Sequence, residues 1–189
     1  MSDAFTLSRT GLRFTIDTHI VDDPSPAVAR LRELASNKEI QFSGSDRILV
    51  EIRDAGLGKR EELESLAWEH DLFLGPFVLG HSELGRSVLP SDEDVADIRL
   101  VFSSLFPTRE WSGARKQDIR DALHVQTSIR YARSGFITRD AVLLRAKKRV
   151  RAMFNGFMIL TPEEAVVLTE RRIKNRQTLE GIRSRPRRG

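Results

Sequence analysis

Apolar residues recur along this chain in two spacings, which predict helices alternating with short strands. Steps of three and four residues, clearest from Ile119 to Ala122 and Leu123, are typical of helices. They predict helices near residues 26–37, 46–56, 59–70, 92–105, 115–134, 142–150 and from 162 onward. Short β-branched and aromatic runs predict strands at 13–17, 39–42, 77–79, 136–138 and 157–160. This alternation favours an α/β fold around a parallel sheet.

The stretch from Asp118 to Asp140 organises the other elements. A helix carrying Asp121 near its start is expected to run to Gly135, which would supply a left-handed stop. A short buried strand follows, and Asp140 comes directly after it. Since the helix leads the chain back along the sheet, we expect both carboxylates at one edge, where open α/β sheets bind ligands.

Two further acids are placed in the same way. Asp17 ends the first strand, and Glu51 lies among apolar neighbours in a helix after the second strand. A carboxylate within an apolar stretch costs free energy unless it is paired or bound to a cation. Together with Asp121 and Asp140, these residues predict a metal site.

Five motifs follow one another along the chain: IDT at 16–18, the helical glutamate, DALHVQTSIRYARSG at 121–135, FITRD at 136–140 and MILTPEE at 158–164. Their order and spacing resemble those of a PIN domain, the metal-dependent ribonuclease fold of bacterial toxins and RNA-processing enzymes. The resemblance covers about residues 13–165. It implies a three-layer α/β/α sandwich with a central, mostly parallel five-stranded sheet, whose carboxyl edge holds Mg²⁺ or Mn²⁺.

Carried onto this sequence, the resemblance implies four residues that act as metal ligands and catalytic acids: Asp17, Glu51, Asp121 and Asp140. Our hypothesis is that the three aspartates bind the ion directly or through water. Glu51 would be a fourth ligand or would orient the attacking water. Thr138 would position Asp140 or a water, and His19 stands where the family usually has Asn or Ser.

Each of these residues also has a purely structural interpretation. Asp17 and Asp140 could be strand-end or N-cap acids, and Glu51 a solvated helix acid. Asp118 is either a first-turn partner of the helix dipole or an additional ligand. His19 either contacts a ligand or belongs to a local turn, and His124 lies either on the helix surface or beside the ligands. The joint pattern favours the acidic site.

Composition excludes several other classes of site. The chain has no cysteine, which rules out disulfides and thiolate metal sites and fits a reducing compartment. It also lacks a histidine pair with zinc spacing and a Gly-rich phosphate loop. Without an apolar run of signal-peptide or membrane-spanning length, we expect a cytoplasmic protein with no membrane partner.

The net charge of +4 is unevenly distributed. Residues 171–189 contain eight basic residues and one acid, Glu180, so this segment carries +7 and the remainder −3. We therefore expect a polar lead-in at 1–12, a nuclease domain at 13–170, and a basic, flexible tail at 171–189. The tail would either bind RNA phosphates or merely solubilise the chain.

The predicted function is hydrolysis of RNA phosphodiester bonds by a metal-dependent endoribonuclease. The resemblance leaves open a toxin held by an antitoxin protein or an RNA-processing enzyme, and it implies a homodimer. The alternative is a catalytically weak or inactive module that binds RNA or acts as a scaffold, with His19 as the sign of divergence.

Overall fold

The structure, a computed structural model, describes residues 8–48, 51, 71–79 and 87–183. Strands β1 (Leu12–Ile16), β2 (Ile40–Ser45), β3 (Asp71–Phe73), β4 (Gly135–Ile137) and β5 (Met158–Leu160) form one sheet. Their order is β3-β2-β1-β4-β5, and each neighbouring pair is parallel. The α/β class and the parallel sheet are therefore confirmed.

Four strands, β1, β2, β4 and β5, lie within a few residues of their predicted positions. The predicted strand at 77–79 is wrong. There the chain makes only an isolated bridge between Pro76 and Val88, and the edge strand β3 comes earlier. Proline has no backbone N–H to donate to a ladder, which explains why the strand ends before Pro76.

Several helices begin where the sequence offers caps. They are α1 (Thr18–Val21), α2 (Pro26–Ser36), α5 (Asp92–Leu105), α6 (Lys116–Arg130), α7 (Ala141–Met153) and α8 (Pro162–Arg183), with a 3-10 turn at Trp111–Gly113. Ser25 caps α2, and Ser91 forms a capping box with Asp94. Residues 47, 48 and 51 are helical, whereas the predicted helix at 59–70 lies outside the described residues.

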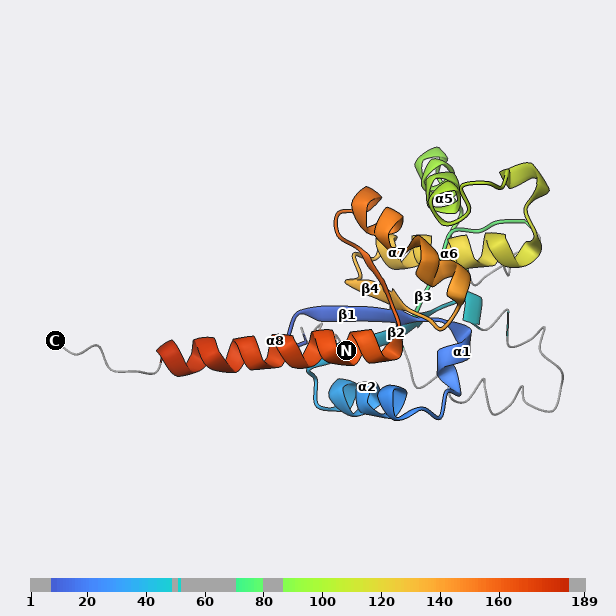
Figure 1. Cartoon of the computed structure of the whole chain (residues 1–189). Coiled ribbons are helices and arrows are strands. Elements are labelled where there is room, and N and C mark those ends of the chain that lie inside the picture. The colour runs from blue at the N-terminus through green and yellow to red at the C-terminus, as the bar shows by residue number, and fades with distance from the viewer. Residues whose placement is uncertain (1–7, 49–50, 52–70, 80–86, 184–189) are drawn as a thin grey trace, which may run out of the picture.

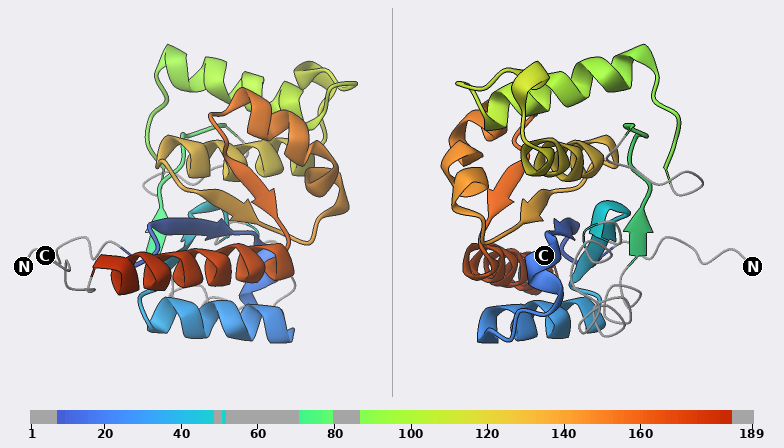
Figure 2. Two further views of the ribbon diagram at one scale, coloured as in Figure 1. Left: turned by 60° about the vertical axis from the view of Figure 1, so that its left-hand side comes forward. Right: turned by 90° about the vertical axis from the view of Figure 1, so that its right-hand side faces the viewer.

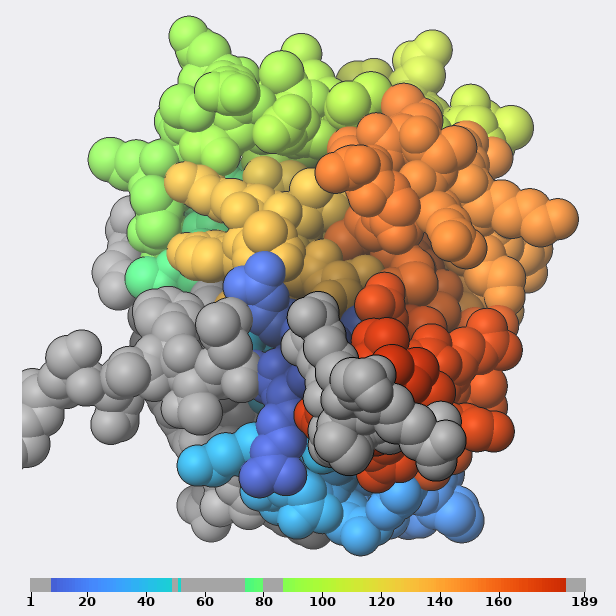
Figure 3. Space-filling view, turned by 90° about the vertical axis from the view of Figure 1, so that its left-hand side faces the viewer, coloured from blue at the N-terminus to red at the C-terminus, as the bar shows by residue number. Residues whose placement is uncertain are grey.

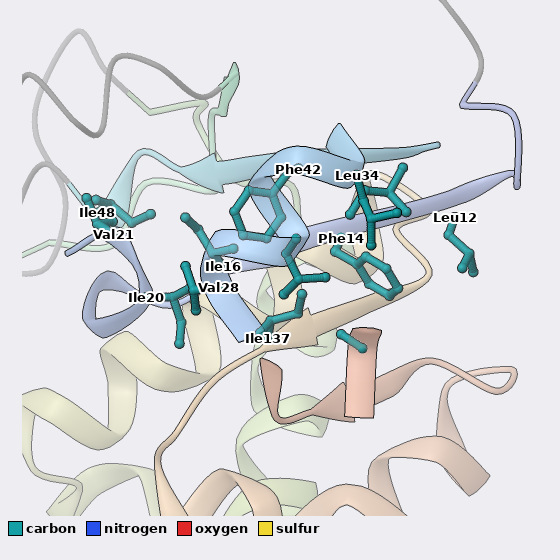
Figure 4. Packing of buried hydrophobic residues seen from close by; sticks show 13 residues of the cluster. Leu12, Phe14, Ile16, Ile20, Val21, Val28, Leu34, Phe42, Ile48 and Ile137 are labelled. Atoms are coloured by element: carbon teal, nitrogen blue, oxygen red, sulfur yellow. The ribbon is translucent and has the colours of Figure 1, made fainter. Parts of the chain in front are cut away.

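Helices cover both faces of the sheet. Figures 1 and 2 show α2 and α8 on one side and α5, α6 and α7 on the other, and Figure 3 shows the same separation from one end of the molecule. On the first side, Phe14, Ile16 and Phe42 pack against α2 and α8 (Figure 4). On the second, Phe136 and Ile159 pack against α5, α6 and α7. Burial of these apolar side chains holds the layers together.

The connection from α6 to β4 differs from the prediction. The helix ends at Arg130, and the left-handed residue after it is Ala132, with φ of 48°, not Gly135. Gly135 instead begins β4, where a Cβ atom would lie 2.5 Å from the carbonyl oxygen of Met158. The glycine is needed because β5 approaches closely.

Ordered structure extends past both predicted boundaries of the domain. The backbone amides of Arg9 and Thr10 bond the carbonyls of Lys38 and Glu39, so the lead-in is packed from Ser8 onward. Helix α8 continues to Arg183, so most of the segment expected to be flexible is helical, and Figure 1 shows its end projecting beyond the sheet. Among the described residues, no helix combines the length and the apolar character needed to span a membrane.

Candidate metal centre

The candidate site lies where the order of the strands reverses. From β1 the sheet extends through β2 to β3 on one side and through β4 to β5 on the other. Asp17 follows β1, and its amide donates to the carbonyl of Ile137 at 2.9 Å; Thr138 then follows β4. This reversal point at the carboxyl edge is the usual ligand site of open α/β sheets.

Three side chains from separate segments meet at this edge. One potential ligand atom each of Asp17, Glu51 and His124 lies within 4.8 Å of the others. Asp17 comes from the end of β1, Glu51 from the helical segment after β2, and His124 from the middle of α6. Asp17 is 8% exposed and His124 2%, so the group is withdrawn from solvent.

Thr138 positions Asp17 and the backbone of Asp140. Its hydroxyl donates to Asp17 Oδ2 at 2.5 Å and accepts from the amide of Asp140 at 2.9 Å. Asp140 Oδ1 accepts from the amides of Val142 and Leu143, which makes it the N-cap of α7. The structural interpretation of Asp140 is therefore realised, and Asp140 is not one of the three residues in the group.

Asp121 lies beside the group in the second turn of α6. It is buried, and Gln117 Nε2 donates to its Oδ1 at 2.8 Å. Burial, assisted by the negative charges of Asp17 and Glu51, raises the pKa of Asp121 to about 7. A cation bound here would favour the ionised carboxylate and so reverse this shift.

The two acids within the group behave differently. Burial raises the pKa of Asp17 despite the opposing effects of His124 and the Thr138 hydroxyl. Burial would also raise the pKa of Glu51, but the adjacent His124 and a hydrogen bond from the Thr18 hydroxyl lower it to about 2. Glu51 is therefore an anion at neutral pH even without a bound ion.

His124 is the member of the group that the sequence-based assignment of ligands left out. Its Nδ1 lies 2.8 Å from Ser45 Oγ at the end of β2, and its Nε2 lies 3.4 Å from Glu51 Oε1. Burial would lower the pKa of His124, but the charges of Glu51, Asp17 and Asp121 outweigh it and raise the pKa. The available signal was the spacing: residues three apart on a helix share a face, so Asp121 and His124 point the same way.

Two other candidates take no part in the group. Asp118 is held by Arg109 at 2.5 Å and Arg115 at 2.8 Å, and these two guanidinium groups hold its pKa below the usual value. Its first-turn position in α6 matches the dipole interpretation. His19 is exposed on α1, although its charge lowers the pKa of Asp17 slightly.

The donor groups fit a divalent cation. Glu51 Oε1 and His124 Nε2 are buried, and neither has a hydrogen-bond partner among the described residues, so their hydrogen-bonding capacity within the group is unmet. Carboxylate oxygens suit Mg²⁺ and Mn²⁺, and an imidazole nitrogen suits transition ions.

No protein-family model matches this chain, and a comparison with curated proteins gave no match.

Proposed function

We propose that this protein is a metal-dependent endoribonuclease of the PIN-like type, built as a three-layer α/β/α sandwich. One observation carries the proposal: Asp17, Glu51 and His124 converge from three segments at the switch point of a parallel sheet, with Asp121 beside them. Several buried acids crowded together repel one another, and a cation would relieve that repulsion.

Asp17, Glu51 and Asp121 would hold Mg²⁺ or Mn²⁺, and Asp140 would join them through water. A cation bound there would help activate a water and neutralise charge developing on the phosphate. The protein's own contribution is orientation. Thr138 fixes one oxygen of Asp17 and the amide of Thr18 fixes the other, at 2.5 and 2.7 Å. Glu51, anionic at neutral pH, would orient the attacking water.

RNA is the proposed substrate because phosphodiester hydrolysis suits a buried acidic cation site. Arg171, Arg172 and Lys174 are exposed on α8. They lie near Arg176, which binds Glu39 at the opposite edge of the sheet, so they would contact only phosphates of a long RNA that lie away from the site. A cytoplasmic location, an antitoxin partner and a homodimer remain predictions.

The test is cleavage of RNA with added Mn²⁺ by the wild-type protein, Asp17→Asn and Asp118→Asn. Asp118 is a matched control because it lies one turn from Asp121 on α6 but is held by two arginines. We expect Asp17→Asn to lower the cleavage rate by about 10³-fold or more and Asp118→Asn to change it little. Equal rates for wild type and Asp17→Asn would refute the proposal.

The alternative function, an inactive RNA-binding or scaffolding module, is favoured by one observation. Asp140 is engaged as a helix cap and lies outside the group formed by Asp17, Glu51 and His124. Binding of RNA with no cleavage in Mg²⁺ or Mn²⁺ would support this alternative.

A further inference from the structure

We propose that His124 Nε2 is itself a ligand of the cation, and that this nitrogen makes the site select a divalent transition ion such as Mn²⁺ over Mg²⁺. The inference rests on the proposed function, since it concerns the same site. It adds a ligand of a different chemical class from the carboxylates.

The distances within the group suit a single ion. His124 Nε2 lies 3.4 Å from Glu51 Oε1, and a ligand atom of Asp17 lies within 4.8 Å of ligand atoms on both residues. Atoms bonded at about 2.1 Å to one octahedral cation lie about 3 Å apart at right angles and about 4.2 Å apart when opposite. Small side-chain adjustments would therefore let all three residues share an ion.

The unmet hydrogen-bonding capacity of two atoms points to the same conclusion. His124 is 2% exposed, yet within the described part of the chain neither its Nε2 nor Glu51 Oε1 has a hydrogen-bond partner. A charged hydrogen bond between imidazolium and carboxylate is normally about 2.7–2.9 Å long, well below the 3.4 Å found here. The two atoms are therefore adjacent but too far apart for a charged hydrogen bond of normal length.

Ser45 fixes the ring in the orientation that ligation needs. Its hydroxyl lies 2.8 Å from His124 Nδ1, and both side chains are buried. When the hydroxyl accepts a hydrogen bond from Nδ1–H, the lone pair of the neutral ring lies on Nε2, toward Glu51. Metal-binding histidines generally donate their second ring N–H to such a partner. The last residue of β2 therefore holds a ligand carried by α6.

The nitrogen has a predictable effect on the choice of ion. Mg²⁺ binds oxygen ligands and gives up its waters reluctantly, whereas imidazole suits transition ions. Replacing one oxygen ligand with Nε2 should therefore weaken the binding of Mg²⁺ more than the binding of Mn²⁺.

The experiment is pulsed electron paramagnetic resonance of the full chain loaded with Mn²⁺, which detects nitrogen bonded directly to the ion. Wild-type protein is prepared with ordinary histidine and with ¹⁵N-histidine, beside His124→Gln and His19→Gln. His19 is the matched control, because it is the exposed histidine nearest Asp17 in sequence. Binding of Mn²⁺ and Mg²⁺ is measured on the same samples.

We expect an imidazole signal that changes with ¹⁵N-histidine in wild type, persists in His19→Gln and disappears in His124→Gln. Affinity for Mn²⁺ should fall by about 10- to 100-fold in His124→Gln. The ratio of the affinity for Mn²⁺ to that for Mg²⁺ should also be smaller in this variant than in wild type. No histidine signal in Mn²⁺-loaded wild type, or a signal retained in His124→Gln, would overturn the inference. The isotope comparison needs no variant, so it holds even if His124→Gln fails to fold.

The outcomes also separate this inference from the proposed function. If Mn²⁺ binds without a nitrogen signal while Asp17→Asn abolishes RNA cleavage, the ribonuclease proposal stands and His124 is not a ligand. If wild type binds no Mn²⁺ at millimolar concentration, ligation by His124 and the preference for Mn²⁺ are both refuted. Cleavage in Mg²⁺ then decides the ribonuclease proposal independently.

Discussion

Asp17 and Glu39 are equally buried at opposite ends of the sheet, at 8% exposure each, yet their pKa values shift in opposite directions. Glu39 precedes β2 and receives hydrogen bonds from Arg176 at 2.8 and 3.0 Å, which lower its pKa. Asp17 follows β1, and its burial raises its pKa. The same fold thus neutralises a buried acid at one edge with a guanidinium. At the other edge it leaves buried acids in need of positive charge, which is typical of a functional site.

The largest expected effect is a pH dependence of stability that arises at the carboxyl edge. Without metal, folded Asp121 keeps its proton up to a pKa of about 7, whereas the unfolded chain releases it near 3.8. The folded state then binds the extra proton, so stability falls as pH rises toward 7, by roughly 2 kcal/mol between pH 5 and 7. The raised pKa of His124 acts in the same direction, because its contribution is lost as pH rises through the folded value.

Urea unfolding in a chelator at pH 5, 6, 7 and 8 measures this slope. Asp121→Asn should make the slope shallower, because an amide does not titrate, and the slope that remains would come from His124. Saturating Mn²⁺ should reverse the wild-type slope, because the ion binds the ionised carboxylates. If the wild-type protein without metal is equally stable at pH 5 and pH 7, the acids at the carboxyl edge do not have raised pKa values, and they are as well compensated as Glu39.

A smaller effect is expected when the Glu39 edge is made to resemble the carboxyl edge. Arg176→Ala removes two charge-assisted hydrogen bonds from a buried carboxylate, at a cost of about 1–2 kcal/mol at pH 7, reduced by the partial exposure of Arg176. The lowered pKa of Glu39 stabilises the fold above about pH 4.5 and ceases to do so as pH falls. The loss should therefore be smaller at pH 3.

Thermal or urea unfolding of Arg176→Ala and Arg176→Lys at both pH values checks this. Lysine keeps the charge but not the two-pronged contact, so it should fall between wild type and alanine. If Arg176→Ala is as stable as wild type at pH 7, the hydrogen bonds from Arg176 to Glu39 do not stabilise the fold.

Much of this fold could be predicted from periodicity, since apolar spacing and caps are local signals. Ser91, Asp94 and Pro162 lie where the helices begin. The strand predicted at 77–79 was wrong because a short apolar run on either side of Pro76 gives no local sign of which half pairs with β2. Gly135 was assigned to a helix stop because sequence cannot show the approach of Met158 across the sheet.

The site was predicted less completely than the fold, for a related reason. The sequence indicates which residues are acidic but not which of them an arginine will neutralise. Asp118 and Asp121 lie one turn apart on α6, yet one is paired with Arg109 and Arg115 while the other is buried beside Asp17. His124 was placed beside the ligands at most, because only the folded chain brings Ser45 and Glu51 next to it.

The smallest change in stability is expected at Asp140, which could serve as a helix cap, as a partner of the ion, or as both. Its Oδ1 caps α7, a task that asparagine performs as well as aspartate, so Asp140→Asn should change stability by only a few tenths of a kcal/mol. Asp140→Ala should cost about 1 kcal/mol through loss of the cap.

Unfolding free energies of both variants, measured beside Mn²⁺-dependent RNA cleavage, separate the role of Asp140 as a cap from a role at the ion. If Asp140 also serves the ion through water, Asp140→Asn will lose cleavage while keeping its stability. If it is only a cap, Asp140→Asn will cleave RNA at the wild-type rate, and the carboxyl edge will consist of Asp17, Glu51, Asp121 and His124 alone.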